Sequence, residues 1–293
     1  MIPSRRPLAG FLCLLAIALP GSLPAGEVLE RIRSSGEMTM GFRTDAPPFA
    51  SLVDGRPQGF SIDLCTLVAG AVKDELGLDE LTARLEPVGT GQRFEALETG
   101  EIDILCGATT ATLSRRERVS FSLPTFVTGV SAAVRADAAP LLREVLVEAS
   151  PAALSDTVVE EALKGRRLGV RRDTTASDWL TGGPIADVEG VAVIPVESHE
   201  AGLAAVQSEE IDAYFADRAI LVGQAGAVQE GPALVVSRKT FTHEPYALAI
   251  PRGDEDLRLV LDRALSHLYR TGTVLKVVAR HFGNPGVDVV LFY

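Results

Sequence analysis

The sequence predicts an α/β fold of two similar lobes joined by two crossing strands. Two local patterns each occur twice in the 293 residues. A strand leads through Gly-x-Arg into a polar loop at 38–43 and again at 167–171, and a helix end turns into a strand at 96–103 and again at 205–212. Strands that alternate with helices usually form parallel sheets. We therefore expect each lobe to be a mostly parallel sheet flanked by helices.

Hydrophobic periodicity places the elements of each lobe. In the first copy we expect a helix over 59–76, a strand over 81–88 and a helix over 93–99. In the second copy we expect a helix over 174–180, a strand over 191–195, a helix over 200–207 and a strand over 211–215.

Two extended segments, 126–135 and 246–251, should cross between the lobes and form a hinge. Helices are expected to follow over 254–269 and 273–281, with the second packing on the first lobe. Lobe 1 then comprises 26–128 plus 252–293, and lobe 2 comprises 129–251. A ligand should bind in the cleft between them, where loops from both copies converge.

The N-terminus has the pattern of a secretory leader. Arg5 and Arg6 precede an apolar run over 8–19, and small residues up to Ala25 follow it. The run is shorter than the roughly 20 residues that span a bilayer. We expect residues 1–25 to be a signal peptide and the mature chain to be soluble and exported.

Charge and composition limit the partners. The formal net charge is −11, and the expected leader removes two more positive charges, so nucleic acid is an improbable partner. An anionic ligand would need a local cluster of arginines that overrides the overall negative field. Cysteine and histidine residues form no cluster with metal-ligand spacing, so we expect no metal or cofactor.

The stretch C-G-A-T-T-A-T-L-S-R-R-E-R-V-S-F-S at 106–122 is a candidate ligand-binding loop. A strand over 102–106 should place Thr109 and Thr110 at its carboxyl end, where open α/β sheets bind ligands.

Arg115 follows in the same stretch. Ser114 is expected to cap a helix, which would put Arg115 in the first turn, where the helix dipole disfavours a cation unless an anion lies nearby. The alternative is that Arg115 is one of several solvated charges over 115–118.

Several segments together resemble the periplasmic solute-binding proteins of polar amino-acid ABC transporters, and within them the glutamate/aspartate receptors. The segments are E-V-L-E-R-I-R-S-S-G-E-M-T-M-G-F-R from Glu27, G-F-S-I-D-L-C from Gly59, the C-G-A-T-T loop with Arg115 and Phe121-Ser122, L-K-G-R-R-L-G-V-R-R-D-T-T from Leu163, and F-G-N-P from Phe282. The resemblance implies a type II periplasmic-binding-protein fold. It also implies a monomer in the periplasm that is not an enzyme, closes on one amino acid and delivers it to a membrane permease.

The resemblance also assigns site residues. It implies that Arg115 binds the α-carboxylate of the ligand, that Thr110 positions the ligand, and that Asp217 binds the α-ammonium group. It implies further contacts for two arginines at the side-chain carboxylate and for three residues around them: Arg43, Arg93, Thr90, Thr174 and His199. A guanidinium offers a carboxylate two parallel charge-assisted hydrogen bonds, which suits such a ligand. The choice between glutamate and aspartate stays open.

Each of four assignments has a plainer alternative. Arg43 could be a strand-end charge and Arg93 a solvated one. Asp217 could pair with its neighbour Arg218, and His199 could simply precede or cap a helix.

Three features depart from the family pattern or remain open. Ala108 replaces a hydroxyl residue. Arg171 is an additional arginine. It would favour a more anionic or larger ligand if it faced the cleft, and it would not affect ligand preference if it paired with Asp173. Segment 137–158 is longer than expected and has no assigned role.

The two cysteines outside the leader, Cys65 and Cys106, form a disulfide or remain free thiols; the sequence allows both.

Two other functions use the same fold. A cyclohexadienyl dehydratase-like enzyme would need a positioned acid, but the sequence shows no catalytic Ser/His/Asp or paired-carboxylate pattern. A ligand-binding partner of a membrane sensor would use the same site as a transport receptor.

Overall fold

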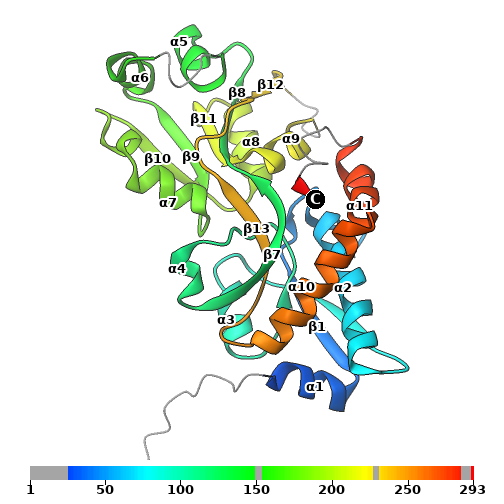
Figure 1. Ribbon diagram of the computed structural model, residues 1–293. Helices are drawn as coiled ribbons and strands as arrows, with labels where there is room; N and C mark the ends of the chain where they lie inside the picture. The colour runs from blue at the N-terminus through cyan, green and yellow to red at the C-terminus, as the bar shows by residue number, and fades with distance from the viewer. Residues whose placement is uncertain (1–25, 149–153, 227–230, 285–291) are drawn as a thin grey trace, which may run out of the picture.

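The computed structural model describes residues 26–148, 154–226, 231–284 and 292–293. In these residues the chain forms two five-stranded sheets, each with helices packed against it, and a small three-stranded sheet (Figure 1). The predicted leader and residues 149–153 of the unassigned segment lie outside the described residues. No helix in the described part of the chain is both long and apolar enough to cross a membrane.

The first sheet has the order β5-β1-β6-β13-β7. Its strands are β5 (Thr82–Pro87), β1 (Glu37–Phe42), β6 (Ile104–Leu105), β13 (Glu244–Pro251) and β7 (Val119–Thr128). β1 is parallel to β5 and β6, whereas β13 is antiparallel to β6 and β7. The strand expected over 102–106 is thus reduced to two residues.

The second sheet repeats this plan with the order β10-β9-β11-β8-β12. Its strands are β10 (Ala192–Val196), β9 (Arg167–Arg171), β11 (Ala213–Asp217), β8 (Val130–Arg135) and β12 (Leu234–Val236). β9 is parallel to β10 and β11, and β8 is antiparallel to β11 and β12. The internal repeat therefore corresponds to two sheets of the same topology.

The helices cover both faces of each sheet. They are α1 (Glu27–Ser35), α2 (Phe60–Leu76), α3 (Arg93–Glu98), α4 (Leu113–Arg116), α5 (Pro140–Arg143), the π-helix η1 (Glu144–Glu148), α6 (Asp156–Leu163), α7 (Thr175–Gly182), the 3-10 helix η3 (Pro184–Asp187), α8 (His199–Gln207), α9 (Arg218–Ala225), α10 (Glu255–Arg270) and α11 (Thr273–Phe282). The small sheet contains β2 (Asp45–Ala46), β3 (Ala50–Val53) and β4 (Arg56–Gln58).

The first lobe has three hydrophobic clusters, of which two are large. Phe60, Leu64 and Val68 recur every fourth residue along one face of α2, and they share a cluster with buried residues of α10 and α11. Phe94 and Leu97 of α3 belong to the other cluster. The predicted packing of the last helix on the first lobe is confirmed.

The two sheets are connected twice. β7 leads through Gly129 directly into β8, and the chain returns between β12 and β13. β13 hydrogen-bonds with β7 over most of its length, so it belongs to the first sheet. We therefore propose that the second lobe ends near 237–243, which is earlier than the boundary at 251 expected from the sequence. Figure 1 shows β7 and β13 side by side between the two groups of helices.

Candidate ligand-binding site

A narrow cleft lies between the two sheets at the ends of several strands. It is lined by Arg43, Arg93, Ala108, Thr110, Arg115, Thr174, Thr175, Ala176, His199, Ala216, Asp217 and Ile220. All the site residues expected from the sequence line it except Thr90 and Arg171, which contact each other at its side. The structure thus brings together side chains that are up to 174 positions apart in the sequence, from Arg43 to Asp217.

Arg115 lies at the first-lobe side of the cleft. The cap of α4 is Thr112 rather than Ser114 as expected, because the Thr112 hydroxyl accepts the backbone hydrogen bond of Arg115. The guanidinium donates Nη1–H to the Thr110 carbonyl over 2.9 Å. Burial lowers its pKa, and Glu244 is the strongest of the acids that oppose this shift. No carboxylate in the described residues forms an ion pair with Arg115, so its charge is available to an anion.

Arg93 is buried, with 4% of its surface exposed. It donates hydrogen bonds to the carbonyls of Thr90 and, across the cleft, Asp173, the latter over 3.0 Å. Burial lowers its pKa to about 9, and the positive charges of Arg115 and Arg43 add to this effect. Its partners are carbonyl groups, so this second cation of the cleft also lacks a carboxylate within the described part of the chain.

Arg43 differs from these two arginines because it already has an acidic partner. Its Nε–H donates to Asp45 Oδ1 over 3.0 Å, and its Nη2 lies 3.2 Å from His199 Nε2 across the cleft. Asp45 also accepts a hydrogen bond from Arg171 over 2.8 Å. Arg171 therefore pairs across the cleft with Asp45, and neither of the two placements considered for it from the sequence describes this arrangement.

His199 is the first residue of α8 and is almost completely buried. Burial lowers its pKa to about 3, and the charge of Arg43 adds to the shift. Because the guanidinium can only donate, Nε2 must accept from Arg43, which places the imidazole proton on Nδ1. Nδ1 lies 2.8 Å from the Tyr214 hydroxyl and can donate to it. His199 therefore acts as a neutral link between the two lobes.

Asp217 ends β11, and the Tyr246 hydroxyl on β13 donates to its Oδ2. Its Oδ1 is buried and has no hydrogen-bond partner in the part of the chain that the structure describes. Burial raises the pKa of Asp217 to about 6. The neighbouring Arg218 donates to the Ser237 carbonyl over 3.0 Å, so the local ion pair considered from the sequence is not formed.

Thr174 caps the N-terminus of α7. Its hydroxyl accepts the backbone hydrogen bond of Ser177 and donates to the Arg171 carbonyl over 2.7 Å. The first residues of α7, Thr175 and Ala176, line the cleft, so free backbone N–H groups and the positive end of the helix dipole face it. Ala108 also lines the cleft and offers no hydrogen bond there.

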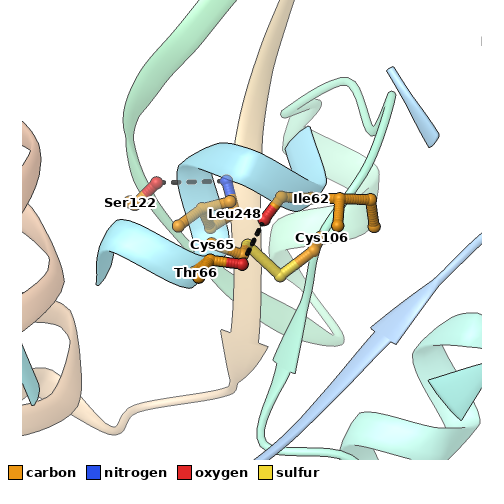
Figure 2. The surroundings of a disulfide bond; sticks show 6 residues. All are labelled: Ile62, Cys65, Thr66, Cys106, Ser122 and Leu248. Atoms are coloured by element: carbon orange, nitrogen blue, oxygen red, sulfur yellow. Dashed lines mark hydrogen bonds between the residues drawn. A yellow bond between two sulfur atoms is a disulfide. The ribbon is translucent and has the colours of Figure 1, made fainter. Parts of the chain in front are cut away.

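A disulfide joins Cys65 to Cys106, with Cα atoms 6.2 Å apart. It ties helix α2 to the residue that precedes the loop with Ala108 and Thr110 (Figure 2). Close by, the Ser122 hydroxyl accepts the backbone hydrogen bond of Leu248 over 3.1 Å. The ligand loop is therefore anchored to the core of the first lobe.

Sequence reasoning missed two important residues. Asp45 follows Arg43 by two positions in a loop, and its partner Arg171 is 126 residues away, so no local pattern shows the pair. Tyr246 starts a predicted crossing strand, where an aromatic residue is unremarkable. The duplicated Gly-x-Arg pattern indicates Arg43 in one copy and Arg171 in the other, but it does not include Asp45.

Residues 38–284 match the family model of the bacterial extracellular solute-binding proteins, family 3. The protein belongs to this family. The L-glutamate/L-aspartate-binding protein of Pseudomonas aeruginosa is 28% identical over 93% of this chain and 86% of its own length. The ABC transporter glutamine-binding protein of Bacillus subtilis is 28% identical over 84% of this chain and 81% of its own length.

Solved structures of other proteins share the fold of this chain. A histidine-bound substrate-binding protein of an ABC uptake transporter from Streptococcus pneumoniae has a TM-score of 0.73 at 20% identity, over 90% of this chain and 98% of that one. This family 3 protein is thus an amino-acid solute-binding protein of the ABC-transporter type with the two-lobe fold expected from the sequence.

Proposed function

We propose that this protein is the periplasmic receptor for an acidic amino acid, glutamate or aspartate, in an ABC transporter. The two lobes close on the ligand, and the closed monomer delivers it to a membrane permease. The observation that carries the proposal is the charge pattern of the cleft. In the described residues, the buried Arg93 and the partly buried Arg115 have no carboxylate partner, and Oδ1 of Asp217 is a buried carboxylate oxygen without a donor.

This pattern is the complement of an amino acid with a second carboxylate. Arg115 and the N-terminus of α7 suit the α-carboxylate, Asp217 suits the ammonium group, and Arg93 suits the side-chain carboxylate. Charge-assisted hydrogen bonds contribute about 1.5–3 kcal/mol each. Micromolar affinity needs about 8 kcal/mol, so these contacts suffice even after the entropy of closure is lost.

Arg43 has a smaller direct part in this proposal than the family resemblance implies. It lines the cleft, but its Nε and Nη2 already bond with Asp45 and His199. Only Nη1 remains for a ligand. We therefore expect Arg93 to be the main partner of the side-chain carboxylate.

The test is isothermal titration of protein that has been unfolded and refolded to remove bound ligand. The ligands are glutamate, aspartate, glutamine and a dicarboxylate without an amine. We expect micromolar or tighter binding of glutamate or aspartate only. Binding of the dicarboxylate alone, or of none of the four, would contradict the proposal.

Variants separate the two carboxylate sites. Arg115→Ala should abolish binding of every amino acid, whereas the exposed neighbour Arg116→Ala should leave binding unchanged. Arg93→Ala should weaken glutamate far more than an uncharged analogue that still binds measurably, and Arg43→Ala should do so to a smaller degree. Equal losses for charged and uncharged ligands would refute the side-chain assignment.

A dehydratase of the same fold is the contrasting candidate. The observation in its favour is the pKa of about 6 at Asp217, because such an enzyme needs a positioned acid. Mass spectrometry of the bound amino acid after long incubation distinguishes the two functions. A receptor returns its ligand unchanged, whereas loss of water from the ligand would show an enzyme. A sensor partner would also return it unchanged, and reconstitution with the permease would separate that function from transport.

A further inference from the structure

Asp45 holds two arginines that come from opposite sides of the cleft. Its Oδ1 accepts from Arg43, 2.9 Å from Nη2, and its Oδ2 accepts from Arg171 Nε over 2.8 Å. Arg43 follows β1 in the first sheet, and Arg171 ends β9 in the second. We call the Asp45–Arg171 ion pair the cross-cleft pair.

The cross-cleft pair is well enclosed. The side chains of Arg171 and Asp45 are 13% and 19% exposed. Arg171 Nη2 donates a further hydrogen bond to the Thr90 hydroxyl over 2.9 Å. Gln224 Nε2 of the second lobe lies 3.4 Å from the Asp45 carbonyl. Charged hydrogen bonds at such a partly desolvated site contribute more than those of exposed ion pairs.

Asp45 remains ionised under all ordinary conditions. Burial by itself would raise its pKa, but the charge of Arg43 and the hydrogen bond from Arg171 outweigh burial and hold the pKa at about 2. The carboxylate therefore neutralises cations of both lobes. Without it, Arg43 and Arg171 would face each other across the cleft as like charges.

We infer that the cross-cleft pair stabilises the closed arrangement of the lobes by itself, with Asp45 acting as an internal substitute for a ligand carboxylate. Arg171 is then a positioning residue for closure and contributes no additional ligand-binding charge. The inference rests on the proposed function only in treating the cleft as the ligand site. The effect of the pair on closure can be measured in the absence of any ligand.

Closure can be measured as the radius of gyration in small-angle X-ray scattering of ligand-free protein. Asp45→Asn should increase this radius most, because it leaves the two arginines facing each other. Arg171→Gln should increase it less, because Asp45 keeps Arg43 as its partner. The double variant should return toward the value of Arg171→Gln, because the repulsion is gone.

A matched control is Arg172→Gln, which removes the next arginine along the chain. Arg172 pairs with the exposed Glu197, so this substitution should leave the radius of gyration unchanged. Arg171→Lys keeps the charge and should restore part of the compaction. Thermal unfolding monitors folding of every variant. Radii equal to wild type in Asp45→Asn and Arg171→Gln would overturn the inference, as would a double variant more open than Asp45→Asn.

Titration with glutamate and with an uncharged analogue that still binds measurably gives a second, independent result. If the pair acts on closure, its loss reduces the population of the binding-competent state, so the affinity for both ligands should fall by a common factor of about ten or more. If Arg171 instead binds the ligand, Arg171→Gln should weaken binding of glutamate and leave binding of the uncharged analogue unchanged, which would overturn the inference. Absence of binding by both glutamate and aspartate would contradict the proposed function, while the scattering result would still decide on the cross-cleft pair.

Discussion

The Tyr246 hydroxyl donates a hydrogen bond to Oδ2 of Asp217, whereas Oδ1 of the same carboxylate is buried without a donor in the described residues. One oxygen is thus fixed by the first sheet, and the other has no partner although the residue lines the cleft. The hydrogen bond from Tyr246 orients the carboxylate without a ligand, and under the proposed function Oδ1 is available to the ammonium group of the ligand.

The affinity for the amino acid should depend on the protonation of Asp217. Its pKa of about 6 lies above the ordinary value because burial disfavours the charged form. Only the carboxylate can bind an ammonium group, so affinity should fall as pH decreases through 6. We expect the dissociation constant to rise about tenfold between pH 7 and pH 5, measured by titration calorimetry.

Asp217→Asn is the matched variant for this pH dependence. It should bind weakly and with no change between pH 7 and pH 5. Because it also removes a buried charge, its free energy of unfolding without ligand should rise at pH 7. A wild-type affinity that is constant across this pH range would show that another group holds the ammonium.

Arg93 should lower the free energy of unfolding of the ligand-free protein, although it contributes to ligand binding. Its pKa is lowered because burial and neighbouring arginines disfavour the cation in the folded state. Arg93→Gln should therefore raise the free energy of unfolding of the ligand-free protein by about 1–3 kcal/mol, even though the cation–π contact with Phe94 at 4.5 Å is lost. Chemical denaturation measures this change.

The control for Arg93→Gln is Arg84→Gln, which removes an exposed arginine paired with Glu37 and should change stability by less than about 1 kcal/mol. The same Arg93 variant should lose affinity for glutamate. A variant that is less stable than wild type and still binds glutamate fully would assign Arg93 to the fold alone.

Gly129 lies where β7 passes into β8, and it should tolerate no side chain. A Cβ atom there would lie 2.1 Å from the Thr242 carbonyl oxygen and 2.7 Å from the Thr240 Cβ. Gly129→Ala should lower the free energy of unfolding by about 1–3 kcal/mol, because the backbone at the crossing must shift.

Gly70 provides the comparison for this substitution. It lies exposed in the middle of α2, and a Cβ there meets nothing within 4 Å. Gly70→Ala should stabilise the protein by up to about 1 kcal/mol. Equal effects of the two substitutions in chemical denaturation would show that the crossing adapts without strain.

The disulfide should contribute to both stability and binding. It closes a loop of 41 residues, for which chain entropy predicts about 4 kcal/mol. A variant with Cys65→Ala and Cys106→Ala should therefore unfold at lower denaturant concentration and bind the ligand less tightly, because the loop after Cys106 loses its anchor. Thr66→Ala, at the neighbouring exposed position, should change stability by less than about 0.5 kcal/mol. An unchanged affinity in the double variant would limit the disulfide to a role in stability.

The sequence predicted the repeated elements well and the contacts between them poorly. The strand and helix periodicities of α2, β9 and α8 are local, so a window of residues is enough to find them. The cap at Thr112 in place of Ser114 shows the usual error at element ends, where neighbouring hydroxyl residues compete. The partner of Arg171 depends on how the two lobes meet, and no local pattern contains that information. The resemblance to a family predicted that these residues line a cleft, but only the structure shows that Arg43 already forms an ion pair with Asp45.

The strands β7 and β13, from which the two connections between the lobes start, form an antiparallel ribbon with Thr128 of β7 opposite Glu244 of β13 and with register shifts near Ala247. A two-stranded ribbon bends easily out of its plane but resists bending within it, because in-plane bending would stretch its hydrogen bonds on one side. Under the proposed function, we expect the lobes to open and close by bending of this ribbon out of its plane. The direction of bending would then determine which donors and acceptors face the ligand each time the cleft closes.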